Sequence, residues 1–108
     1  MIAKKNRLDR KLIEEIFKNG KFLSSSDLTF KFIQGTSPIL RRISFIAPKA
    51  VAKSSVKRNL LRRRGYAALK KHLGKFPASI IGAFVFKRYQ QDISIIENEI
   101  ENILNKIN

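Results

Sequence analysis

The chain has 108 residues, of which 44% are hydrophobic and eight are Phe, so we expect one domain, residues 1–108, with a core of modest size. The absence of cysteine excludes disulfides and thiolate metal sites. No apolar run reaches the roughly 18 residues of a membrane span, and the N-terminal residues lack the apolar stretch of a signal peptide. We therefore expect a cytoplasmic protein with no membrane partner.

Positive charge is concentrated in the middle of the chain. The formal net charge is +15, and the 64 residues from Leu28 to Gln91 contain 15 of the 23 Lys and Arg but no Asp or Glu. All eight acids lie outside this block. Such a block repels itself unless phosphate groups neutralise it, which indicates a nucleic acid as the partner. An anionic membrane surface is a weaker candidate, because the basic segment lacks a broad face of bulky apolar residues.

Hydrophobic periodicity divides the chain into segments with the period of a strand and segments with the period of a helix. The predicted elements are a helix over 9–19, a turn or edge strand over 22–27, strands over 28–33 and 39–47 with a turn at 34–38 between them, a helix over 54–74, a strand over 78–86 and a helix that begins near 92–94. Residues 78–86 are almost continuously apolar, which is typical of a strand covered on both faces. The order α-β-β-β-α-β-α predicts an α+β fold with a small sheet packed by helices.

The segment from Ala52 to Lys75 carries nine Lys and Arg and no acid. On a helix its apolar residues form one stripe, made of Leu61, Gly65, Ala68, Leu69 and His72. Ser54 or Ser55 is a suitable N-cap, and Gly74 is a suitable terminator. Like charges four residues apart weaken a helix by about 0.2–0.5 kcal/mol per pair, so their retention indicates a polyanion. The alternative, a solvated lysine-rich face, is less favoured because such faces normally mix charges of both signs.

The residue types that protein catalysis requires are scarce in this sequence. A two-metal nuclease needs clustered carboxylates, whereas the central block has none and the flanking acids look like helix-surface or capping residues. His72 is the only histidine, and on the apolar stripe packing is favoured over catalysis. Neither a nucleophile–base pair nor a zinc site can be assembled. Taken alone, the chain is not expected to be an enzyme, and we predict no catalytic residue and no metal ligand.

Phosphate binding is the chemistry that the basic helix offers. Arg58, Arg62 and Arg63 can present planar guanidinium forks to phosphate oxygens, and Asn59 can bond to bases or sugars. Tyr66 could stack on a base, although packing against the sheet is at least as favoured. Further cations crowd the start of the first helix, where they oppose its dipole and suggest a second phosphate contact: Lys4, Lys5, Arg7, Arg10 and Lys11.

The stretch Val56-Lys-Arg-Asn-Leu-Leu-Arg-Arg-Arg resembles the signature of the bacterial ribonuclease P protein component. In that family an Arg-Asn pair is followed on the same helix by a Lys/Arg-Arg pair, and Arg58-Asn59 and Arg62-Arg63 occupy these positions. The resemblance covers nearly the whole chain. Asn6-Arg7-Leu8 followed by Ile16-Phe-Lys-Asn-Gly resembles the opening helix, and Arg42-Ile-Ser-Phe-Ile-Ala-Pro-Lys resembles the strand and lysine that lead into the signature.

The resemblance implies an α+β fold with a left-handed βαβ crossover and a role as the protein subunit of the ribonucleoprotein that cuts the 5′ leader from precursor tRNA. The catalyst there is the RNA subunit with its Mg²⁺ ions, and the protein itself would hold no cofactor. The contact with the RNA subunit would fall on Lys49, Lys53, Lys57, Arg58, Asn59, Arg62 and Arg63. The cleft that holds the leader would include Ile13, Phe17 and Lys31.

Several positions depart from the family's pattern. Leu60 stands where a basic residue is common, and Tyr66 holds a later Arg position. Arg64 and Gly65 replace a pair that is usually apolar. Aromatic residues are common at the positions of Ile13 and Lys31, so base stacking in the leader cleft is the property that these departures affect most.

Two other classes of protein are compatible with the charge. A ribosomal protein or other structural binder of folded RNA explains the basic helix equally well, but not the ordered resemblance of helix, strands and signature. A helix-turn-helix DNA-binding protein is less favoured, because strands flank the basic helix and no short helix lies one turn before it. We therefore expect the ribonuclease P RNA subunit and precursor tRNA as partners, and no DNA.

Overall fold

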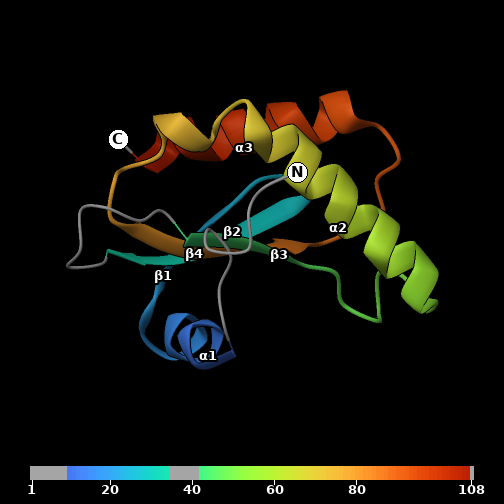
Figure 1. Cartoon of the computed structure of the whole chain (residues 1–108), viewed down its shortest axis with the longest axis horizontal. Coiled ribbons are helices and arrows are strands. Elements are labelled where there is room, and N and C mark those ends of the chain that lie inside the picture. Colours follow the sequence, from blue (N-terminus) through green and yellow to red (C-terminus); the bar gives the residue numbers. More distant parts are fainter. Residues whose placement is uncertain (1–9, 35–41, 108) are drawn as a thin grey trace.

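The computed structural model describes residues 10–34 and 42–107 (Figure 1). Its elements are α1 (Arg10–Asn19), β1 (Lys21–Ser24), β2 (Leu28–Gln34), β3 (Arg42–Ile46), α2 (Ser55–Lys70), the short 3-10 helix η2 (Leu73–Lys75), β4 (Ile80–Phe86) and α3 (Ile93–Ile107). This order confirms the predicted α+β class and the predicted sequence of elements. Lys4, Lys5, Arg7, the first residue of the predicted opening helix, most of the predicted turn at 34–38 and the start of the predicted strand at 39–47 lie outside the described ranges.

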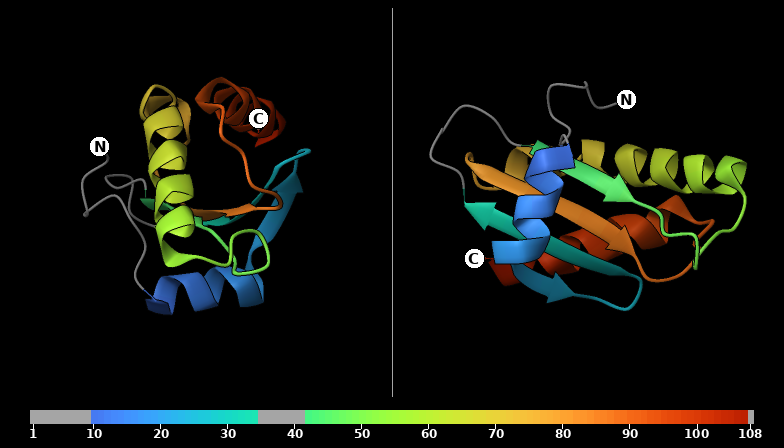
Figure 2. Two further views of the ribbon diagram at one scale, coloured as in Figure 1. Left: turned by 90° about the vertical axis from the view of Figure 1, so that its right-hand side faces the viewer. Right: turned by 90° about the horizontal axis from the view of Figure 1, so that it is seen from below.

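The four strands form one mixed sheet in the order β1-β2-β4-β3. β2 pairs antiparallel with both β1 and β4, whereas β3 pairs parallel with β4. Because β3 and β4 run in the same direction, α2 carries the chain back along one face of the sheet. Figures 1 and 2 together show that this β3-α2-β4 connection is left-handed, although about 98% of such connections are right-handed. The rare hand that the family resemblance implies is therefore present.

Helices cover both faces of the sheet. In Figure 2, α2 and α3 lie side by side on one face, and α1 crosses the strands on the other. This double cover leaves every residue of β4 buried or partly buried, as its apolar run predicts. Of the helices in residues 10–34 and 42–107, only α1 lies on its face of the sheet.

Phenylalanine rings from the strands form the centre of the core between the sheet and the pair of helices α2 and α3. The Phe84 ring centroid lies 4.3 Å from that of Phe30 and 5.0 Å from that of Phe45, and both pairs are stacked. Phe76 meets the Phe30 ring edge-on at 5.7 Å. All four rings are buried, and each contributes about 1.5–3 kcal/mol by leaving water.

The start of α2 agrees with the sequence, but its end does not. The Ser54 hydroxyl oxygen accepts a hydrogen bond from the Lys57 N–H at 3.1 Å, which confirms Ser54 as the N-cap. The helix ends at Lys70, so the predicted end at Gly74 is wrong. The Leu69 carbonyl oxygen accepts from the His72 N–H at 2.8 Å in a tighter turn, and Gly74 lies within η2.

Two acids expected at helix surfaces or caps are instead buried and hydrogen-bonded. Glu99 on α3 accepts at Oε1 from the Ser25 hydroxyl at 2.8 Å and from the Asp27 N–H. The Asp27 carboxylate in turn accepts from the Gln90 side chain at 3.1 Å and pairs with Arg88 at 3.0 Å. These contacts fasten the β1–β2 turn to α3 and to the segment after β4.

Gly65 of α2 lies directly over the ring of Phe45. A Cβ atom at position 65 would lie 2.5 Å from Cδ1 of that ring, which is buried in the aromatic stack and has no free space to enter. We therefore expect Gly65→Ala to lower the free energy of unfolding by about 1–3 kcal/mol in urea denaturation. Gly74→Ala is the matched control, because no atom lies within 4 Å of the added carbon. Equal stability of the two variants would contradict the importance of this contact.

Candidate nucleic-acid interface

The residues predicted to contact an RNA subunit form one surface on the N-terminal half of α2 and the loop before it. This basic surface consists of Lys49, Lys53, Lys57, Arg58, Asn59, Arg62 and Arg63. Arg58 and Arg62 are partly buried, and the other five residues are exposed. The two ion pairs within residues 10–34 and 42–107 lie elsewhere, between Lys71 and Glu97 and between Arg88 and Asp27. No acid in the described part of the chain therefore neutralises the basic surface by direct pairing.

The burial of the apolar stripe determines which side chains of α2 face outward. Leu61, Gly65, Ala68 and Leu69 are all buried, as their spacing predicts. Since residues three and four apart share a helix face, this burial places Asn59 and Arg63 on the opposite side and Arg62 at the border. The same hydrophobic contacts that attach α2 to the sheet thus expose its cations.

Arg58 holds the loop that precedes its own helix. Its Nη1 donates to the carbonyl oxygens of Ala52 at 3.1 Å and Lys53 at 2.7 Å. Hydrogen bonds from a charged donor stabilise by about 1.5–3 kcal/mol. A guanidinium has five N–H donors, so these bonds leave others for a phosphate. Arg58 therefore combines its predicted binding role with a positioning role that the sequence pattern did not indicate.

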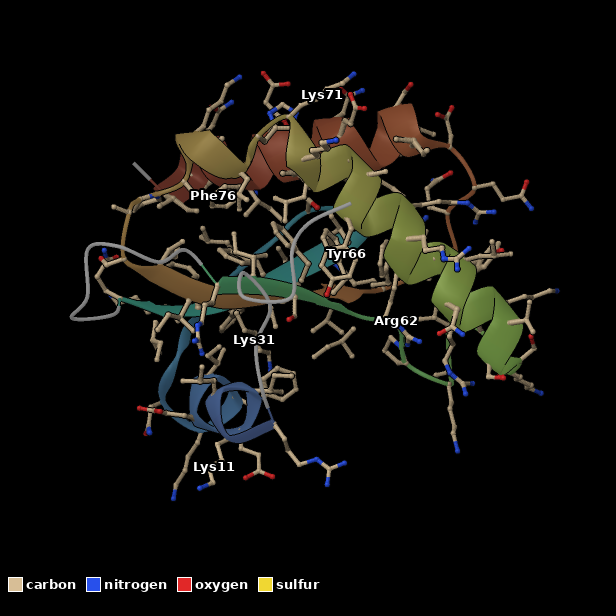
Figure 3. All side chains as sticks on the ribbon, in the orientation of Figure 1. Lys11, Lys31, Arg62, Tyr66, Lys71 and Phe76 are labelled. Atoms are coloured by element: carbon tan, nitrogen blue, oxygen red, sulfur yellow. The ribbon has the colours of Figure 1, made fainter. Side chains whose placement is uncertain are left out.

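Asn59 and Arg62 are joined to each other across one turn of α2. Nη2 of Arg62 donates to Oδ1 of Asn59. This bond uses one of the two lone pairs of the amide oxygen, and the amide NH2 and the other N–H groups of the guanidinium stay available as donors to phosphate, sugar or base oxygens. Figure 3 shows Arg62 beside the end of the sheet. The geometry thus presents a fixed set of donors rather than two independent flexible side chains.

Tyr66 and His72 belong to the core rather than to the binding surface. The Tyr66 side chain points to the sheet in Figure 3, and its hydroxyl oxygen accepts from the Phe45 N–H at 3.2 Å. Its ring meets the Phe45 ring edge-on at 5.2 Å. The interpretation of Tyr66 as a base-stacking residue is therefore wrong, and the packing alternative is confirmed. His72 is 9% exposed, which confirms its predicted packing.

Tyr89 is an aromatic residue at the basic surface that the sequence analysis missed. The Arg64 guanidinium lies 5.4 Å from the centroid of its ring, and Nη1 donates to the Tyr89 hydroxyl oxygen at 3.2 Å. Tyr89 also lines a hollow of about 440 Å³ together with Lys53 and Lys57. Its position after β4 gives no periodic signal, since it comes to α2 only through the folding of the sheet.

The predicted leader-binding residues lie on the sheet face that α1 covers. Lys31 extends from β2 toward α1, and its Nζ lies 4.6 Å from the centroid of the Phe17 ring. Ile16 is buried beneath the helix, whereas Phe17 remains 47% exposed at its margin. Ile13 lies one turn before Phe17 and is partly buried. The structure thus brings Phe17 and Lys31 together, with Ile13 beside them on the helix.

The two predicted surfaces open toward the same side of the molecule. In Figure 1 the N-terminal end of α2 descends past the end of the sheet to the side on which α1 lies. This end of α2 therefore lies toward the same side of the sheet as α1.

The described residues offer few donors to a metal ion. Among residues 10–34 and 42–107, no group of three or more His, Asp or Glu side chains could hold one. The buried carboxylates of Asp27 and Glu99 are engaged with N–H and hydroxyl donors. Within these ranges no helix is long and apolar enough to cross a membrane. The chemistry of the surface is therefore that of cations, N–H donors and exposed aromatic rings.

The fold and the surface together are those of a class of protein: small α+β proteins whose basic surface and exposed aromatic side chains suit RNA. The sequence matches the ribonuclease P family over residues 2–108. The chain thus belongs to the ribonuclease P protein family, the protein subunits of the ribonucleoprotein enzyme that processes tRNA. This assignment favours the ribonuclease P interpretation over the ribosomal alternative and implies an RNA partner and a tRNA substrate.

Solved structures agree with the family at the level of the fold. The RNase P protein of Staphylococcus aureus has a TM-score of 0.82 at 16% sequence identity, with 96% of each chain covered. The RNase P protein of Thermotoga maritima has a TM-score of 0.80 at 19% identity, with 94% of this chain and 97% of that chain covered. No curated protein matches the sequence. The fold is thus shared although most side chains differ.

Arg58 and Arg63 carry the same charge but differ in their intramolecular contacts. Arg58→Ala would leave the carbonyl groups of Ala52 and Lys53 without their donor, so we expect the free energy of unfolding to fall by about 1 kcal/mol or more. Arg63 is exposed, and Arg63→Ala should change the free energy of unfolding by no more than about 0.5 kcal/mol. Urea denaturation of both variants measures the difference, and an unchanged stability of Arg58→Ala would show that the two bonds are not structural.

Proposed function

We propose that the chain binds the ribonuclease P RNA subunit through its basic surface and holds the 5′ leader of precursor tRNA beside α1, while the RNA subunit cuts the tRNA. The observation that carries this proposal is the basic surface itself, on which six Lys and Arg and one Asn lie together and pair with no acid of the described ranges. A polyanion of high charge density is the partner that such a surface fits.

The basic surface favours association by releasing counterions. Each phosphate that a Lys or Arg neutralises contributes about 0.7–0.9 to the slope of log affinity against log salt concentration. Because Arg58 and the Asn59–Arg62 bond fix part of the surface, fewer side chains lose freedom on binding. The surface thus supplies both electrostatic attraction and a defined orientation on the RNA.

The surface beside α1 suits unpaired nucleotides. A single strand exposes base faces that stack on aromatic rings, and its backbone attracts a nearby ammonium group. Phe17 and Lys31 present these two groups side by side. A paired stem hides its base faces, so this arrangement favours a single-stranded leader over the body of a mature tRNA.

Catalysis is assigned to the RNA subunit and the Mg²⁺ ions that it requires. The described side chains do not fit a metal centre of their own, so no step of the cleavage is attributed to them. The protein's part is to bind, to orient the leader and to reduce the repulsion between two RNA molecules. Lower repulsion reduces the concentration of Mg²⁺ that assembly with the substrate demands.

Replacement of Arg62 and Arg63 by Ala is expected to weaken assembly with the RNA subunit and to lower the salt slope by about 0.7–0.9 for each phosphate that the variant no longer neutralises. Filter binding over a series of salt concentrations measures both quantities. Each single replacement is compared with Lys70→Ala, which removes one charge from the same helix outside the basic surface and is the matched control. A full salt slope after both arginines are replaced would contradict the assignment of this surface.

Phe17→Ala is expected to reduce the preference of the holoenzyme for leader-bearing over mature tRNA. Loss of one base–aromatic stack costs about 1–3 kcal/mol, which corresponds to a decrease of about fivefold or more in the affinity ratio. The ratio is measured by binding the two tRNAs to holoenzymes reconstituted with each protein. Equal losses for both tRNAs would indicate that Phe17 serves packing alone.

Reconstitution tests the proposal as a whole. Added protein is expected to restore cleavage of precursor tRNA by the RNA subunit at low Mg²⁺, where the RNA alone is inactive. The purified protein without RNA should leave the substrate intact. Cleavage by the protein alone would refute the division of roles, and failure to bind the RNA subunit would favour a structural RNA-binding function elsewhere.

A further inference from the structure

The exposed phenylalanine rings of this chain are gathered in one place. Of the eight Phe residues, five are buried and Phe32 is partly buried. Phe17 and Phe22 are 47% and 68% exposed. Phe17 lies on α1, and Phe22 lies on β1, the strand at the edge of the sheet. The family resemblance implies a role for Phe17 and none for Phe22.

The register of the sheet places Phe22 beside Lys31. The two residues are direct partners in the antiparallel pair of β1 and β2. Side chains of directly opposed residues point to the same face, with Cβ atoms about 4.5–5.5 Å apart. Lys31 reaches the Phe17 ring on the face that α1 covers. Phe22 therefore lies on this face as well, and the two exposed rings flank one ammonium-bearing side chain.

Packing does not account for Phe22. The core of aromatic rings lies on the opposite face of the sheet, beneath α2 and α3, and the Phe22 ring is mostly in water. Edge strands normally carry charged side chains that discourage pairing with other chains, and a large exposed aromatic residue there raises the risk of aggregation. A ring kept at this position despite that risk fits a partner with planar, apolar faces.

We propose that Phe22 is a base-stacking residue, which extends the leader-binding surface from α1 across β2 to the edge strand. The ligand is unpaired RNA of the 5′ leader, with one base against Phe22, another against Phe17 and phosphate near Lys31. Charge complementarity supports this occupant, because Lys31 between the two rings is cationic and an RNA backbone is anionic. This inference rests on the proposed function of the surface beside α1.

The test uses holoenzymes reconstituted with the RNA subunit, and tRNAs with no leader or with leaders of increasing length. Phe22→Ala should lower the affinity ratio of leader-bearing to mature tRNA by about fivefold or more, and only for leaders long enough to reach β1. Phe22→Tyr should retain the ratio, because it keeps the ring. Ile95→Ala is the matched control, since Ile95 is 40% exposed on α3, which lies on the other face of the sheet.

The outcomes separate this proposal from the one on which it rests. If Phe17→Ala lowers the ratio and Phe22→Ala does not, Phe22 is not part of the surface, while the proposed function stands. If neither variant lowers it, the proposed function of this face fails. Sedimentation of the protein measures self-association as a third readout. If Phe22→Ala abolishes self-association and leaves the affinity ratio of leader-bearing to mature tRNA unchanged, the ring belongs to an interface between copies and the proposal is overturned.

Discussion

The close approach of α2 to the Phe45 ring is the constraint on which the rest of the arrangement depends. Gly65 allows the helix backbone to approach the ring, and Tyr66 bonds through its hydroxyl to the backbone of the same strand residue. These two contacts with Phe45, one through its ring and one through its backbone, fix the rotation of α2 about its axis. The cations of the basic surface keep their direction because the apolar side of α2 is fixed in this way.

Much of the fold can be predicted from hydrophobic periodicity, because this pattern depends only on residues that are close together in the chain. The alternation in β2 and β3, the apolar run of β4 and the buried stripe of α2 predict both the elements and the faces that they bury. The end of α2 could not be predicted in the same way. Gly74 is a favourable terminator, but the chain leaves the helix earlier and continues in tighter turns.

The parts of the site that the sequence did not predict depend on contacts between distant residues. In the sequence, Glu99 and Asp27 have the pattern of helix-surface or capping acids. Their buried hydrogen bonds form only because the β1–β2 turn packs against α3. Tyr89 reaches Arg64 only after β4 is in place, and Phe22 acquires a neighbour in Lys31 only through strand register. The direction of Arg63, by contrast, follows from the helical spacing of the buried residues around it.

The placement of the acids on α3 has a consequence for the first encounter with RNA. Glu97 pairs with Lys71 just after the end of α2, and Glu101 lies one turn further along α3, whereas the basic surface, toward the other end of α2, carries no acid. A molecule with charge divided in this way experiences a torque in the field of a polyanion, up to a separation of about 8–10 Å at moderate ionic strength. The basic surface therefore turns toward the RNA before contact, and a larger fraction of encounters leads to binding.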